Sequence, residues 1–127
     1  MEILPGIHQL KLPFPLQPEQ LAVNAYLIQG DGGCLLVDTG WNMNQAYSAL
    51  ERQLREIGLG FGDISLILIT HFHPDHYGLA GRLVKASGAR VALHRIERDF
   101  LDARYLNMDA LLDQTADILR ANGVPEK

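Results

Sequence analysis

Three of the chain's five histidines and one aspartate lie within ten residues, in the stretch ITHFHPDHYG. His71 and His73 are two positions apart, so on an extended backbone their side chains project to the same side and can reach one metal ion. The proline that follows fits the first position of a helix, which would carry Asp75 and His76 in its first turn, displaced toward a second ion. Imidazole and carboxylate groups are ligands that zinc, iron and manganese accept. The stretch therefore predicts a metal centre.

The alternative is a surface loop that happens to carry histidines. The position of the stretch argues against that interpretation, because it directly follows the apolar run 64–69. Such a run predicts a buried strand, and α/β proteins place their sites at the carboxyl ends of these strands. Because nearly every residue of the run is apolar, we expect the strand to be covered on both faces.

The segments before this strand predict three more. Residues 7–12 alternate apolar and polar side chains, and 23–29 and 34–37 are largely apolar and separated by the turn signal Asp31-Gly32-Gly33. Between the first two strands, an irregular loop is predicted by Pro13, Pro15 and Pro18. We expect an antiparallel meander whose third strand ends at Asp38.

Helical spacing appears after residue 44 and in the last third of the chain. A helix is expected from 44 to the stop signal Gly58, and a short helix around 79–88 is followed by one more strand at 91–93. Two further helices are predicted at 96–105 and 108–121, with Gly123 and Pro125 as stop signals. The order of these elements predicts an α/β fold with a mixed sheet and flanking helices.

The composition is that of an ordinary globular domain, with 127 residues, 47% of them hydrophobic. Eleven basic and fifteen acidic residues give a net charge of −4, so we expect no nucleic-acid partner. We also expect no membrane partner, because no apolar stretch approaches spanning length and no signal-peptide pattern is present. The lone cysteine, Cys34, is expected to be a buried thiol in a reduced, cytoplasmic protein.

The histidine stretch, His71-Phe-His73-Pro-Asp75-His76, resembles the His-x-His-x-Asp-His signature of the metallo-β-lactamase superfamily. Leu36 to Gly40 resembles the upstream motif of that family, a strand end with an aspartate that supports the metal loop. Val23 to Ile28 resembles its usual second strand. The resemblance covers essentially the whole chain.

The resemblance implies an αββα sandwich, of which residues 1–98 would be the N-terminal half and 99–127 the start of a helical insertion or cap. It implies a hydrolase with one or two ions of zinc, iron or manganese, in which His71 and His73 hold the first and Asp75 and His76 the second. A metal-activated water would be the nucleophile, and Asp75 would be the catalytic residue among these ligands. Asp38 and Thr70 would orient the ligand loop. Candidates for lining a substrate pocket are Trp41, Tyr77 and His94.

The chain departs from the family pattern downstream. Family members supply two more histidines and a bridging aspartate, whereas only His94 follows His76 here, too early in the chain for the third metal histidine. His8 is interpreted as a surface residue. We therefore expect a truncated N-terminal fragment of a longer enzyme, with weak or partial metal binding and no meaningful activity by itself.

Several functions remain open on these grounds. The leading hypothesis is a hydrolase of small-molecule esters, thioesters or lactones, similar to hydroxyacylglutathione hydrolases, with β-lactams less favoured and nucleases disfavoured by charge. An oxygenase with a single iron on the same scaffold is an alternative. Another is a non-catalytic half-domain that self-associates. A homodimer is expected in any case, through the uncovered sheet face or the C-terminal helices.

Overall fold

The computed structural model of the protein describes residues 1–15 and 21–124. The expected loop residue Pro18 and the stop signal Pro125 lie outside the described residues. The chain divides into two compact units, the first spanning Met1–His94 and the second beginning at Arg95. No helix in the described ranges is both long enough and apolar enough to cross a membrane.

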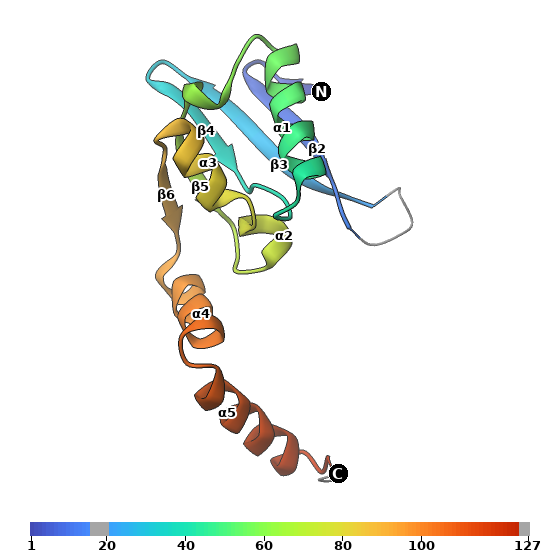
Figure 1. Ribbon diagram of the computed structural model, residues 1–127, viewed down its shortest axis with the longest axis vertical. Coiled ribbons are helices and arrows are strands. Elements are labelled where there is room, and N and C mark those ends of the chain that lie inside the picture. Colours follow the sequence, from blue (N-terminus) through green and yellow to red (C-terminus); the bar gives the residue numbers. More distant parts are fainter. Residues whose placement is uncertain (16–20, 125–127) are drawn as a thin grey trace. The chain divides into compact units, whose positions relative to one another are not determined.

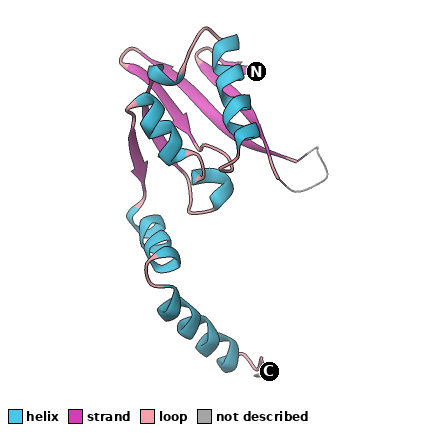
Figure 2. Ribbon diagram, in the orientation of Figure 1, coloured by secondary structure: helices cyan, strands magenta, loops and turns pink. Residues whose placement is uncertain are grey.

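One sheet organises the first unit, and its strands follow one another across the sheet in sequence order (Figures 1 and 2). The strands described are β1 (Glu2–Leu4), β2 (Ile7–Pro13), β3 (Ala22–Gly30), β4 (Gly33–Val37), β5 (Ile64–Ile69) and β6 (Arg90–Leu93). Neighbours from β1 to β4 are antiparallel, whereas β4, β5 and β6 run parallel. The predicted meander and the predicted mixed sheet of an α/β protein are confirmed. The short β1 was not predicted.

Three helices accompany this sheet in the described part of the first unit: α1 (Asn44–Glu56), α2 (Pro74–Tyr77) and α3 (Ala80–Ser87). A single 3-10 turn, η1 (Phe61–Asp63), precedes β5. The expected stop at Gly58 is confirmed, because this residue follows α1 with a φ of +78° that favours glycine. The short helix that was expected around 79–88 corresponds to α3, and α2 is a separate turn before it.

The core lies between the sheet and α1 and α3, which cover one face of it (Figure 2). The strands β2, β3 and β4 contribute alternate residues, as the pleat requires. Side chains with no exposed surface include Leu12, Leu27, Leu36, Leu50, Leu54, Ile67 and Leu83.

The expectation that β5 is covered on both faces is wrong for the described residues. Ile67 faces the helices and has no exposed surface, but its neighbour Leu68 is 37% exposed. Leu66 and Leu68 point to the other face of the sheet, where the packing is incomplete. An apolar run thus predicted the strand correctly without showing whether both of its faces are packed.

His8 is also corrected, because it is buried and not a surface residue. It is on the same face of β2 as Leu10 and Leu12, and only 6% of its surface is exposed. Its Nε2 lies 3.3 Å from Oε1 of Gln29 on β3, whereas its Nδ1 has no hydrogen-bond partner in the described structure. The strand's alternation decides the placement, even though the residue is polar.

The second unit consists of α4 (Arg95–Tyr105) and α5 (Met108–Ala121), at the positions predicted for two helices. Neither helix contains a buried residue. Large apolar side chains that are exposed on them include Phe100, Leu112 and Ile118. Helices with so little buried surface gain little from packing within this unit.

Candidate metal centre

The carboxyl ends of β4 and β5 bring two sequence motifs together. These strands are parallel, with Val37 opposite Leu68, so the residues that follow each strand emerge at the same edge of the sheet. The pairing continues one step further, because the backbone N–H of Asp38 donates to the carbonyl of Leu68 at 2.9 Å. Asp38 therefore lies beside the start of the histidine stretch, as expected.

The Asp38 carboxylate is buried and accepts three hydrogen bonds. Its Oδ1 accepts from the backbone N–H of Thr70 at 2.8 Å, and its Oδ2 accepts from the Thr70 hydroxyl at 2.7 Å. Oδ2 also lies 2.8 Å from Nδ1 of His76. Asp38 has a φ of +60°, which is unusual outside glycine but tolerated by aspartate. The carboxylate thus connects the end of β5 with α2.

His76 is held in one orientation by that contact. An ionised carboxylate can only accept, so Nδ1 of His76 carries a proton. Nε2 lies 3.4 Å from Oδ2 of Asp75. Two ligands of a tetrahedral zinc ion at about 2.0–2.1 Å are separated by about 3.4 Å. The spacing of Asp75 and His76 therefore fits two ligands of one divalent ion.

His71 and His73 form a second pair of the same kind. Nε2 of His71 and Nδ1 of His73 are 3.1 Å apart, with ring centroids at 4.6 Å. The ring of His71 also lies 4.0 Å from that of His76, so the two pairs are adjacent. Across residues 1–15 and 21–124, however, no three His, Cys, Asp or Glu side chains are grouped to hold one ion. The four predicted ligands thus come together as two pairs and not as a complete site.

The backbone of α2 is fixed by Thr39, which the sequence analysis did not identify as a site residue. Thr39 has no exposed surface, and both its N–H and its hydroxyl donate to the carbonyl of His76, at 2.7 and 2.9 Å. Its hydroxyl oxygen also accepts from the N–H of Leu79 at 3.1 Å. The sequence feature that could have identified Thr39 is its position directly after Asp38. A buried hydroxyl at that position can form hydrogen bonds with the backbone of a neighbouring turn.

Gly78 lets this turn approach the loop after β4. A Cβ at this position would clash with the carbonyl oxygen of Pro74, and it would lie 2.6 Å from the backbone nitrogen of Asn42 and 2.8 Å from the carbonyl oxygen of Gly40. All three contacts are to backbone atoms, which cannot move aside easily. Close packing of α2 therefore requires glycine here for steric reasons.

The three candidate pocket residues occupy different surroundings. Trp41, in the loop after β4, packs edge-on against Phe14 with ring centroids 5.7 Å apart. Tyr77, on α2, is partly buried against the core. His94 directly follows β6, which pairs in parallel with β5, so it emerges at the same sheet edge as the histidine stretch.

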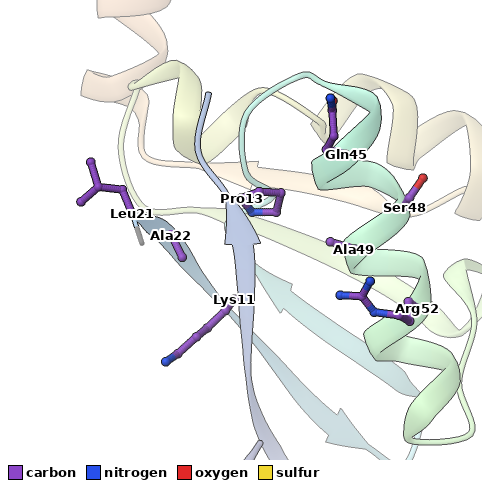
Figure 3. Close-up of a pocket in the computed structure, with 8 residues that line it drawn as sticks. All are labelled: Lys11, Pro13, Leu21, Ala22, Gln45, Ser48, Ala49 and Arg52. Atoms are coloured by element: carbon purple, nitrogen blue, oxygen red, sulfur yellow. The ribbon is translucent and has the colours of Figure 1, made fainter. Parts of the chain in front are cut away.

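A groove of about 520 Å³ lies elsewhere on the first unit, between α1 and the facing ends of β2 and β3 (Figure 3). Its lining residues are Lys11, Pro13, Leu21, Ala22, Gln45, Ser48, Ala49 and Arg52. None of the predicted ligands or pocket residues is among them. The groove is thus a feature separate from the histidine cluster.

Two solved structures with this fold are metallo-β-lactamase proteins. A metallo-β-lactamase family protein from Thermus thermophilus superposes with a TM-score of 0.78 and 39% identity, covering 99% of this chain and 41% of that chain. A metallo-β-lactamase from Cronobacter sakazakii has a TM-score of 0.60 and 26% identity, covering 72% of this chain and 32% of that chain. The fold is therefore that of the metallo-β-lactamases, over part of their length.

The model of the metallo-β-lactamase superfamily matches residues 18–126, and the chain belongs to that family. Similar curated proteins include the probable metallo-hydrolase YqjP of Bacillus subtilis, 36% identical over 70 residues, which are 55% of this chain and 21% of that protein. Ribonuclease Z of Streptomyces coelicolor is 36% identical over 69 residues, 54% of this chain and 21% of that protein. The matches thus span about a fifth of these relatives. Membership in a superfamily of metallo-hydrolases implies the use of divalent metal ions.

Proposed function

We propose that the protein contributes the metal-ligand loop of a hydrolase that cleaves small-molecule esters, thioesters or lactones. The observation that carries the proposal is the pairing of nitrogen and oxygen donors at the end of β5. His71 Nε2 and His73 Nδ1 are 3.1 Å apart, and Asp75 Oδ2 and His76 Nε2 are 3.4 Å apart. Each pair has a spacing suited to one divalent ion, and the two pairs are adjacent to each other. The donors are those that zinc, iron or manganese would take.

The residues of this chain would have distinct roles at the metal site. His71 and His73 would hold one ion, and Asp75 and His76 the other. Bound there, a divalent ion would lower the pKa of a coordinated water to about 7 and polarise the scissile carbonyl. Asp75 would also be the catalytic residue, because its second carboxylate oxygen can accept a hydrogen bond from the nucleophilic water. Asp38 would keep the ligand loop in place through Thr70 and His76.

Each pair is one ligand short of the three protein ligands that are typical of a catalytic zinc. We therefore propose that residues 1–127 bind metal weakly and hydrolyse little by themselves. Groups from a longer polypeptide or from a neighbouring chain would complete the site. A cytoplasmic location belongs to the same proposal, because a single cysteine requires no oxidising compartment.

Metal content and hydrolysis should be measured together to test this function. We expect substoichiometric zinc after dialysis and little turnover of ester, thioester or lactone substrates by residues 1–127. A longer natural form should bind more zinc, turn substrates over, and lose both properties in His71→Ala and Asp75→Ala. Two tightly bound ions and ordinary turnover from these residues alone would contradict the proposal of an incomplete site.

A nuclease is the second candidate, and the similarity to ribonuclease Z favours it. The net charge of −4 weighs against it, because contacts to a phosphate backbone need basic residues. Cleavage of RNA by the longer form, with no turnover of small esters, would establish the nuclease. Oxygen consumption that depends on iron would instead indicate a mononuclear-iron oxygenase on the same scaffold.

We also propose that the chain forms a homodimer through the sheet face that carries no helix of the first unit. The strand register places two rows of partly exposed apolar side chains on this face. The rows consist of Ile7, Ile28, Leu35 and Leu66, and of Tyr26, Val37 and Leu68. A second copy offers the same apolar rows, and two such sheets can stack face to face about a two-fold axis. If neither this pairing nor hydrolysis occurs, a non-catalytic half-domain with some other partner would remain.

A further inference from the structure

We propose that Thr70 is a positioning residue that transmits the charge of Asp38 to His71 and fixes which nitrogen of His71 carries the proton. The inference rests on the proposed metal site. It concerns hydrogen positions in the metal-free protein, so it can be tested without any hydrolysis. The evidence is a chain of two hydrogen bonds that links the buried carboxylate of Asp38, the hydroxyl of Thr70 and the imidazole of His71.

The direction of the first hydrogen bond follows from the carboxylate. The Thr70 hydroxyl lies 2.7 Å from Oδ2 of Asp38, which is only 4% exposed. A carboxylate accepts hydrogen bonds and donates none, so the single hydroxyl proton of Thr70 must point toward it. The N–H of Thr70 donates to the other carboxylate oxygen at 2.8 Å, which holds the residue in register with Asp38.

The direction of the second bond follows from the first. Nδ1 of His71 lies 2.9 Å from the same hydroxyl oxygen, whose proton is already donated to Asp38. The oxygen can only accept from the ring, so Nδ1 of His71 carries the proton. Nε2 of His71 is then left with its lone pair, and it is the atom that faces His73. Through Thr70, Asp38 thus keeps the lone pair of His71 on Nε2.

His73 differs from the other two histidines. Its Nδ1 lies 3.1 Å from the unprotonated Nε2 of His71, so in the metal-free protein the proton between these two atoms belongs to His73. An ion that takes both nitrogens as ligands must displace that proton, which a neutral ring can carry on Nε2 instead. We therefore infer that His71 is preset for metal binding and that His73 must change its tautomer.

Nitrogen-15 spectra of the imidazoles can test this inference, because they distinguish a protonated ring nitrogen from an unprotonated one. We expect His71 of the metal-free chain to be protonated at Nδ1 and unprotonated at Nε2. Zinc should leave the tautomer of His71 unchanged and move the His73 proton from Nδ1 to Nε2. A His71 ring protonated at Nε2 in the metal-free protein would overturn the proposal.

Two substitutions at Thr70 separate the hydroxyl from the shape of the side chain. Thr70→Val keeps the branched shape but removes the hydroxyl. We expect a mixture of His71 tautomers and no change at His76. Zinc binding should weaken about 10-fold, which is the lower end of the effect of residues that support metal ligands. Thr70→Ser keeps the hydroxyl and should restore the wild-type spectrum. If Thr70→Val leaves the His71 tautomer intact, the transmission through Thr70 is wrong. If the tautomers behave as expected and the longer protein still hydrolyses nothing, the proposed function fails and the positioning role stands.

Discussion

Thr39 holds the carbonyl oxygen of His76 with two hydrogen bonds, from its N–H at 2.7 Å and from its hydroxyl at 2.9 Å. Thr39, two residues after β4, therefore fixes the backbone of α2 at the same histidine whose ring is bonded to Asp38. Backbone and side chain of His76 are each anchored to neighbouring residues of one strand end. A predicted ligand is thus held in place before any ion arrives.

Thr39→Val should destabilise the protein. The substitution keeps the volume but removes a buried hydroxyl that donates to His76 and accepts from Leu79. The loss of a buried hydrogen-bonding group costs about 1–3 kcal/mol. Urea unfolding should show a lower midpoint, and Thr39→Ser should recover most of the loss. Equal stability of the valine variant and the wild type would mean that the hydroxyl contributes little.

The sequence predicted the parts of this site that depend on local patterns. The predicted ligands His71, His73, Asp75 and His76 follow an apolar strand, and parallel pairing of β4 and β5 then brings Asp38 beside them. Thr39 was missed because its role depends on a contact with α2, which is distant in sequence. His8 was misplaced because a polar residue was assumed to face outward, although the alternation of β2 turns it toward the core. Contacts between residues distant in sequence therefore limited how much of the site the sequence alone could predict.

Gly78→Ala should be strongly destabilising, with Gly81→Ala as its matched control. A Cβ at Gly78 would lie within 2.8 Å of three backbone atoms, whereas one at Gly81 would meet nothing within 4 Å. Gly81 lies inside α3, where alanine is better than glycine by about 0.5–1 kcal/mol. We expect Gly78→Ala to lose roughly 2 kcal/mol or more and Gly81→Ala to gain stability. Thermal unfolding of both variants would measure the difference, and similar effects from the two would contradict the steric argument.

The Cys34 thiol should react slowly in the folded protein. It is 5% exposed, and burial, followed by the nearby charge of Asp63, raises its pKa. A raised pKa means less thiolate at a given pH, and thiolate is the reactive form. Modification by a disulfide reagent at about pH 8 should be slow in buffer and fast in urea. Rapid modification under native conditions would show that β4 opens readily.

The same raised pKa predicts a dependence of stability on pH. The folded state favours the neutral thiol of Cys34, so its contribution is complete below the unfolded pKa of about 8.5 and is lost as pH rises through the higher folded value. Unfolding free energies of the wild type should therefore fall more steeply above that pH than those of Cys34→Ala. Parallel curves for the two proteins would contradict this assignment.

The apolar sheet face is expected to form the homodimer, and charge placed on it should disrupt the association. Leu35 is in the middle of one apolar row, between Ile28 and Leu66. Leu35→Lys would bury a charge between two stacked sheets, where desolvation opposes it. Light scattering at micromolar concentrations should show a dimer for the wild type and a monomer for this variant.

Leu112→Lys is the matched control, because Leu112 is a 58% exposed leucine on α5, outside the sheet. We expect this variant to remain dimeric. If it dissociates while Leu35→Lys does not, the C-terminal helices form the interface, because their exposed apolar side chains are then the ones that a second copy covers. A wild type that is monomeric across this concentration range would contradict both arrangements, since both apolar surfaces would then remain open to water.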